Sequence, residues 1–171
     1  IFNLAKNITM KKTIITAVIL LFTLTKVTAQ ESKLNLGTGL GITSAEATGG
    51  VALSLESNYL FKISEKFKLG PSISLLHYFG GLENLIGETN KTSTYLPTAM
   101  ALRYSLTQKS MIGFDFGYAI GISDTEGASY FRPMYGYTIS DKLLLQLTYS
   151  SMGQENGDLV SNLSLGVMFK I

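Results

Sequence analysis

The chain has 171 residues, of which 46% are hydrophobic and only 15% are charged, and it contains no Cys. This length suits one domain rather than two, and the missing Cys excludes a disulfide framework and a thiolate zinc site. The formal net charge is +2. Four lysines precede the expected mature start at Gln30, however, and the remaining ten basic and twelve acidic residues leave a net charge of −2. This balance gives no support to nucleic-acid binding.

The first thirty residues have the features of an export signal. Met10 is followed by two lysines, residues 13–25 form an apolar stretch, and small residues end at a cleavage point after Ala29. The apolar stretch is shorter than the ~20 residues with which a helix crosses a bilayer. We therefore predict a cleavable signal peptide over 10–29 rather than a retained anchor. Residues 1–9 precede the plausible start and are interpreted as a non-native extension.

The remaining chain, residues 30–171, is expected to form one domain built from eight alternating segments. In each segment, bulky apolar residues occupy every second position, and Gly, Ala, Ser, Thr or charged residues lie between them. In an extended chain these two sets point to opposite faces, so the pattern predicts β-strands. The segments are Leu34–Ile42, Val51–Lys62, Phe67–Leu75, Leu96–Leu106, Ile112–Ile120, Phe131–Ile139, Leu143–Ser150 and Leu159–Ile171.

The connections between these segments alternate in length. Three are short, and the others are longer and richer in Gly and acidic residues. An even number of strands with short turns at one end and long loops at the other is typical of a transmembrane β-barrel with periplasmic termini. No segment offers helices to cover the apolar faces, so we expect these faces to contact lipid. Closure into a barrel also removes the open sheet edges that lipid would not tolerate.

The end of the chain carries a further motif. After Ser164, the residues Gly166, Phe169 and Ile171 follow the pattern polar-x-Gly-x-x-aromatic-x-aromatic, except that Ile171 replaces the final aromatic residue. This ending resembles the assembly signal that outer-membrane barrels present to the barrel-assembly machinery. Together with the signal peptide and the eight segments, it makes the mature chain similar to the small porin-like outer-membrane β-barrels of diderm bacteria, the OmpA/OmpX type.

This resemblance implies an all-β, eight-stranded, antiparallel up-and-down barrel in the outer membrane. It also implies a monomer in contact with outer-membrane lipid and lipopolysaccharide. Eight strands enclose an interior that side chains can fill, so an open porin channel is not expected. The sequence offers no segment for a peptidoglycan-binding domain and no motif for a cofactor.

The inward-facing residues include four charged side chains, Glu56, Arg103, Asp115 and Arg132. If consecutive strands are neighbours, Asp115 lies between the strands that carry the two arginines. Charges buried this deeply must pair, because an unpaired buried ion costs several kcal/mol. We therefore predict an ion-pair network in the lumen, which Glu56 joins from across the barrel. The network could serve only to fill the lumen, or it could act as a gate or proton pathway.

Two alternative functions are open. Some eight-stranded outer-membrane barrels modify lipid A, which requires a nucleophile and a base. The single His, His77, is expected on the lipid side beside an aromatic girdle that includes Tyr78, and no His-x-Ser motif accompanies it. We therefore expect no enzymatic activity. The other alternative is a soluble lipocalin-like binder, in which the apolar faces would turn inward around a small ligand.

The long loops are expected at the cell surface, and they are acidic. They carry seven carboxylates against Lys91 alone. Such loops could hold divalent cations or meet a basic extracellular partner, but carboxylates also keep exposed loops soluble. No Asp-x-Asp-x-Asp spacing indicates a metal site. The sequence thus favours a non-enzymatic protein with an envelope structural or surface-interaction role. The acidic residues are Glu46, Glu83, Glu88, Asp124, Glu126, Glu155 and Asp158.

Overall fold

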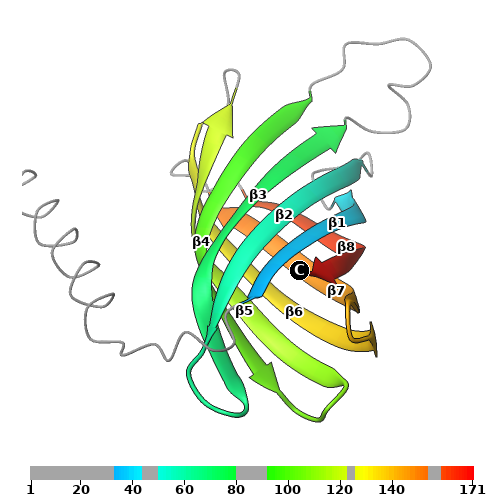
Figure 1. Ribbon diagram of the computed structural model, residues 1–171. Helices are drawn as coiled ribbons and strands as arrows, with labels where there is room; N and C mark the ends of the chain where they lie inside the picture. Colours follow the sequence, from blue (N-terminus) through cyan, green and yellow to red (C-terminus); the bar gives the residue numbers. More distant parts are fainter. Residues whose placement is uncertain (1–32, 44–49, 80–91, 123–125, 154–158) are drawn as a thin grey trace, which may run out of the picture. The chain divides into compact units, whose positions relative to one another are not determined.

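The computed structural model describes residues 33–43, 50–79, 92–122, 126–153 and 159–171. The predicted extension and signal peptide lie outside these residues. Within the described residues the chain forms eight strands (Figure 1). These are β1 (Lys33–Thr43), β2 (Val51–Lys62), β3 (Phe67–Phe79), β4 (Ser93–Ser105), β5 (Ser110–Ile122), β6 (Ala128–Ser140), β7 (Leu143–Gly153) and β8 (Leu159–Lys170). The described part of the chain has no helix that is long and apolar enough to span a membrane.

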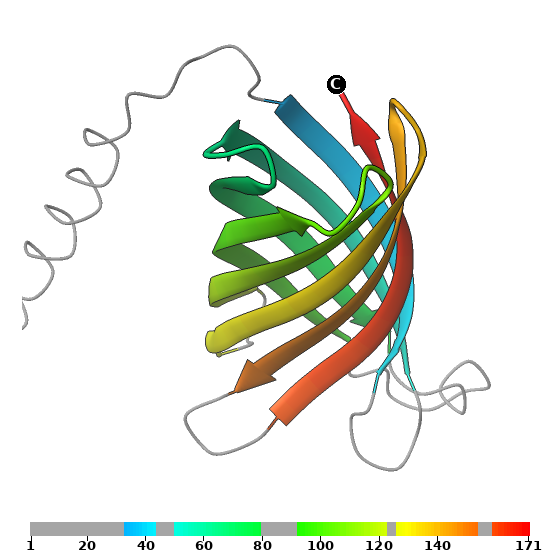
Figure 2. The same cartoon turned by 90° about the horizontal axis from the view of Figure 1, so that it is seen from below.

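The strands close into one antiparallel barrel, in which each strand pairs with the next in sequence and β8 pairs with β1. The predicted fold class is therefore confirmed. The short β2–β3, β4–β5 and β6–β7 turns lie at the same end as the C terminus. Figure 2 shows the C terminus beside the β6–β7 turn, where the Lys170 amide donates to the Lys142 carbonyl at 2.9 Å. We call this the short-turn end and the opposite end the long-loop end.

The apolar faces of the strands point outward. Phe116 is 48% exposed and Leu165 is 57% exposed, and similar rows of Leu, Ile, Phe and Tyr follow every strand. An apolar surface that follows all eight described strands around the barrel far exceeds what a protein exposes to water, so its natural environment is lipid. The lipocalin-like alternative is wrong, because it would turn these same rows inward.

Each of the three prolines lies within a strand and interrupts one ladder. Opposite Pro71, the β2–β3 pairing stops after Asn58↔Ser72 and resumes at Phe61↔Leu69. The β3–β4 ladder is interrupted in the same way at Pro97 and the β6–β7 ladder at Pro133. Proline has no amide hydrogen to donate, which explains each gap. The pairing register is the same on both sides of each of these gaps, and the β6–β7 ladder shifts register elsewhere, between Thr138 and Ser140 next to its turn.

Several strands extend further toward the long-loop end than the alternation predicts. β3 continues to Phe79, β4 begins at Ser93, and β6 begins at Ala128. In these extensions large residues also occupy the inward face, which departs from the pattern of small residues inside and large residues outside. These inward positions form a buried cluster around Tyr78, Tyr95, Tyr130 and Met152.

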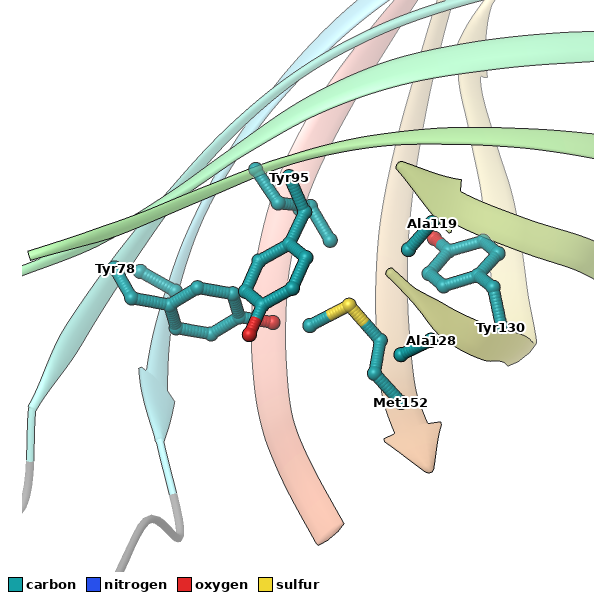
Figure 3. Close-up of a cluster of buried hydrophobic side chains, with 8 residues drawn as sticks. Tyr78, Tyr95, Ala119, Ala128, Tyr130 and Met152 are labelled. Carbon is teal, nitrogen blue, oxygen red and sulfur yellow. The ribbon is translucent and has the colours of Figure 1, made fainter. Parts of the chain in front are cut away.

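Figure 3 shows this cluster, in which the Tyr78 and Tyr95 rings meet edge to face with centroids 5.9 Å apart. The assignment of Tyr78 to an outer aromatic girdle is therefore wrong. Tyr78 is only 7% exposed and points into the barrel. The phase of the strand decides this: His77 and Phe79 point outward, so the residue between them must point inward.

Candidate functional site

The middle of the lumen is crossed by a network of charged side chains. β4, β5 and β6 are consecutive neighbours, so Asp115 of β5 lies between Arg103 of β4 and Arg132 of β6. Arg103 Nη1 pairs with Asp115 Oδ1, and Arg132 Nη2 lies 2.5 Å from Asp115 Oδ2. Arg132 Nε also donates to Asp115 Oδ2, at 3.0 Å. The central carboxylate thus accepts from both guanidiniums.

A second carboxylate enters from the opposite wall. Glu56 of β2 pairs through Oε2 with Arg132 Nη1, and its Oε1 accepts from Gln146 Nε2 of β7. The structure therefore brings together all four of the charged residues that the sequence singles out. No one of the four is more than 5% exposed. Two carboxylates meet two guanidiniums, so the net charge of the network is zero.

Glycines make room for this network at two places. A Cβ atom on Gly37 of β1 would lie 2.9 Å from Glu56 Cγ and Oε1. A Cβ atom on Gly113 of β5 would lie 2.6 Å from Arg103 Cδ and 2.7 Å from Met134 Cγ. All of these distances are too short for a Cβ atom in ordinary van der Waals contact. The two long charged side chains therefore cross the lumen only because the neighbouring wall carries no side chain at these points.

Polar contacts continue the network toward the long-loop end. Ser150 Oγ lies 2.6 Å from Asn162 Oδ1, and Asn162 Nδ2 donates to the Tyr78 hydroxyl at 3.0 Å. Beyond these contacts lies the tyrosine cluster, in which Tyr95 and Met152 are at most 2% exposed. The lumen is thus filled by an aromatic layer above a charged layer. Alternation alone does not identify Gln146 and Asn162 as partners, although each is a side-chain amide on the inward face of its strand.

A small cluster of apolar side chains covers the charged layer on the side of the short-turn end. Met134, Leu144 and Met168 are buried together, and Met111 packs against them. Beyond this group, at the short-turn end, the inward-facing positions carry lysines.

The single His lies on the outer wall. His77 Nδ1 is 2.9 Å from Thr94 Oγ1 of the neighbouring strand, and the His77 ring meets Phe79 edge to face. Its outward position agrees with the phase of β3. Among the described residues, no three His, Cys, Asp or Glu side chains lie close enough together to hold a metal ion.

The remaining predicted residues lie at the two ends of the barrel. In the assembly motif, Phe169 and Ile171 are exposed on the outer surface, and Gly166 faces Gly39 across the β1–β8 ladder. Of the seven loop acids, only Glu126 belongs to the described residues, where it is exposed. The other six fall on residues outside the described ranges.

The closed antiparallel barrel, its lipid-facing apolar surface and its filled interior define a small transmembrane β-barrel. The fold is similar to that of Ail, the attachment invasion locus protein of Yersinia pestis, with 10% identity and a TM-score of 0.57 over 82% of this chain and 97% of that chain. Neisserial surface protein A gives 12% identity and a TM-score of 0.50 over 82% of this chain and 97% of that chain.

A designed transmembrane β-barrel is also similar, with 12% identity and a TM-score of 0.53 over 81% of this chain and 95% of that chain. No family model and no curated protein matches the sequence. At these identities the likeness concerns the fold alone. The fold is that of the small eight-stranded barrels of the bacterial outer membrane.

Proposed function

We propose that the protein is a non-enzymatic barrel of the outer membrane, with a closed polar lumen and a role in envelope structure or in contact at the cell surface. The observation that carries this proposal is the network of Glu56, Arg103, Asp115 and Arg132, which crosses the lumen and is almost completely buried. A water-filled channel would leave these groups hydrated.

The network supports a structural role because its charges balance and its groups pair with one another. Each buried ion costs several kcal/mol to remove from water, and this cost is offset only when all partners are in place. The ion pairs of this network join β2, β4, β5 and β6 and so fix their relative positions. The aromatic layer around Tyr95 and Met152 adds a second barrier along the same axis.

Planar-bilayer recordings test the closed lumen. The wild-type protein is expected to produce no stable single-channel conductance. Arg132→Met removes the charge that joins the two carboxylates but keeps a long side chain, so it is expected to lower stability without opening a channel. Lys109→Met, at an exposed turn position, serves as the control for losing one positive charge.

Heat-modifiable migration in gels shows which variants remain folded. A conducting wild-type protein would contradict the closed lumen. A folded Arg132→Met variant that conducts would instead show that the network acts as a gate.

For the surface role, the charge of the long loops is the relevant feature. Ail has a solved structure in complex with the heparin analogue sucrose octasulfate, which is a polyanion. The present loops carry seven acids against Lys91, so we infer that a surface partner of this protein would be cationic. Glu83→Gln combined with Glu88→Gln is then expected to reduce the adhesion of intact cells to a polycationic surface. Unchanged adhesion would leave the loop acids with a solubilising role.

Lipid A modification is the second candidate, and the contact between His77 and Thr94 is the observation that bears on it. A hydroxyl next to an imidazole is the start of a nucleophile and base pair, but catalysis also needs a group that orients the base. The His77 imidazole lies on the outer surface of the barrel next to Phe79, where it faces lipid. We expect lipid A to be identical in cells with the wild type and with His77→Ala. Any product that depends on His77 would contradict the non-enzymatic role.

A further inference from the structure

The lumen opens at the short-turn end into a small cavity of about 40 Å³. A single water needs roughly 10–15 Å³ on this measure, so the space suits a few waters or one small ion. Four of its lining residues are cationic, and none of the described lining residues is an acid. The lining residues are Lys33, Asn35, Leu60, Lys68, Arg103, Met111, Leu144, Met168 and Lys170.

The pairing of the strands places these cations next to one another. Lys68 of β3 is directly opposite Arg103 of β4, and both face the lumen. Like charges directly opposite each other in a ladder are destabilising. Lys170 of β8 is opposite Asn35 of β1, two residues after Lys33 on the same face. Four strands thus direct positive charge into one small space.

Arg103 supplies a second, independent observation. Its side chain is 3% exposed, and its Nη1 donates to Asp115 and to the Leu102 carbonyl. Its Nη2 has no hydrogen-bond partner among the described residues. A buried guanidinium nitrogen without an acceptor is costly, and Arg103 lines the cavity. An acceptor in the cavity would satisfy it.

The acidic side chains that the structure describes at this end do not supply that acceptor. Glu65 lies in the β2–β3 turn, where it pairs with Lys62 at 3.5 Å and is 90% exposed. Asp141 lies in the exposed β6–β7 turn. Neither residue lines the cavity. Lys170 Nζ donates to Thr138 Oγ1 at 3.3 Å, which leaves further hydrogens of its ammonium group for another acceptor.

We propose that this cavity is a binding site for a phosphate-type oxyanion at the periplasmic mouth of the barrel. Lysine ammonium groups bind phosphate as point charges, and an arginine nitrogen adds a directed hydrogen bond. The anion could be free inorganic phosphate or the phosphate of a phospholipid headgroup in the inner leaflet. Either source presents the same oxygens to Lys33, Lys68, Lys170 and Arg103.

Titration followed by NMR tests the site, with the protein purified from membranes and placed in nanodiscs. In the first arm maltoside micelles, which contain no phosphate group, replace the nanodiscs, and inorganic phosphate is added. In the second arm phosphate is omitted and phosphatidylglycerol replaces part of the lipid. The amide signals of Asn35 and Lys170 report on the cavity. Both arms are repeated with Lys33→Gln, Lys170→Gln and the control Lys109→Gln, which removes a turn lysine that does not line the cavity.

We expect Lys33→Gln and Lys170→Gln each to weaken binding on the order of tenfold, as the loss of one charge-assisted hydrogen bond implies, and Lys109→Gln to leave it unchanged. Binding confined to the first arm identifies the free ion, and binding confined to the second identifies the headgroup. An equal loss in all three variants would show a general effect of charge and would overturn the site. Absence of binding in both arms would also overturn it.

Discussion

The charged layer in the middle of the lumen and the tyrosine cluster near its long-loop end fill the same barrel by different means. In the charged layer, long side chains pair across the lumen, and Gly37 and Gly113 give them space. In the tyrosine cluster, rings and Met152 fill the volume directly, with Ala on the walls between them. Electrostatic pairing therefore holds the first region, whereas packing volume holds the second.

This difference shows what each region can tolerate. A volume-conserving change that removes a charge should damage only the charged layer, because it leaves a buried ion without its partner. A large-to-small change should damage only the tyrosine cluster, because it leaves a cavity. Three substitutions test this comparison by their effect on the free energy of unfolding, measured by urea titration in lipid vesicles.

The largest effect is expected for Asp115→Asn. The new amide has nearly the same volume, but Arg103 and Arg132 lose the carboxylate that both contact. Removing one partner of a buried ion pair costs about 4 kcal/mol. Glu65→Gln makes the same chemical change in an exposed pair and should cost less than about 1 kcal/mol. Equal effects of the two variants would show that the buried network contributes nothing particular to stability.

A smaller loss is expected for Met152→Ala. Met152 is fully buried in the tyrosine cluster, so its truncation leaves a cavity and should cost about 3 kcal/mol. Met100→Ala is the matched control, because Met100 lies on the outward face of β4, where lipid can occupy the vacated space. We expect this control to cost about 1 kcal/mol or less. If the two Met variants lose the same free energy of unfolding, packing in the tyrosine cluster does not stabilise the long-loop end.

The smallest loss, about 2 kcal/mol, is expected for Gly113→Ala. The added methyl group would overlap Arg103 Cδ and Met134 Cγ, so Arg103 must move away from Asp115, and overpacking of this kind is moderately destabilising. At Gly153 a Cβ would meet only Ser129 Oγ, at 3.2 Å. Gly153→Ala should therefore be neutral within about 1 kcal/mol. A neutral Gly113→Ala would mean that Arg103 has more freedom than its contacts indicate.

The same two regions show how far the sequence could predict the structure. The charged layer follows from alternation, because Glu56, Arg103, Asp115 and Arg132 all fall on the face that otherwise carries small residues, and consecutive strands are neighbours. The tyrosine cluster reverses this rule. Tyr78, Tyr95 and Tyr130 are large residues on the inward face. The rule that large residues face lipid therefore places Tyr78 on the outer surface, and it ends the predicted strands just before they reach Tyr95 and Tyr130.

The contact between Gln146 and Glu56 could not be predicted either. Gln146 donates to Glu56, which lies 90 positions away in the sequence. The alternation of a strand shows which side chains point into the lumen, but not which residues of a distant strand lie at the same depth. The alternation is equally silent on which ladder each proline interrupts, as Pro71, Pro97 and Pro133 each do in one ladder. These features depend on register, which the pairing of all eight strands fixes together.

The interruptions in strand pairing next to the three prolines should be the places where the barrel yields first to mechanical stress. Each interruption removes hydrogen bonds between two adjacent strands at one depth in the membrane. The hydrocarbon contains no water that could donate in place of the missing proline amide hydrogen. When the surrounding bilayer is stretched or thinned, separation of neighbouring strands should therefore begin at these three places. Backbone amides next to the prolines should exchange with deuterium sooner than amides at the same depth in β1 and β8, whose ladder is continuous.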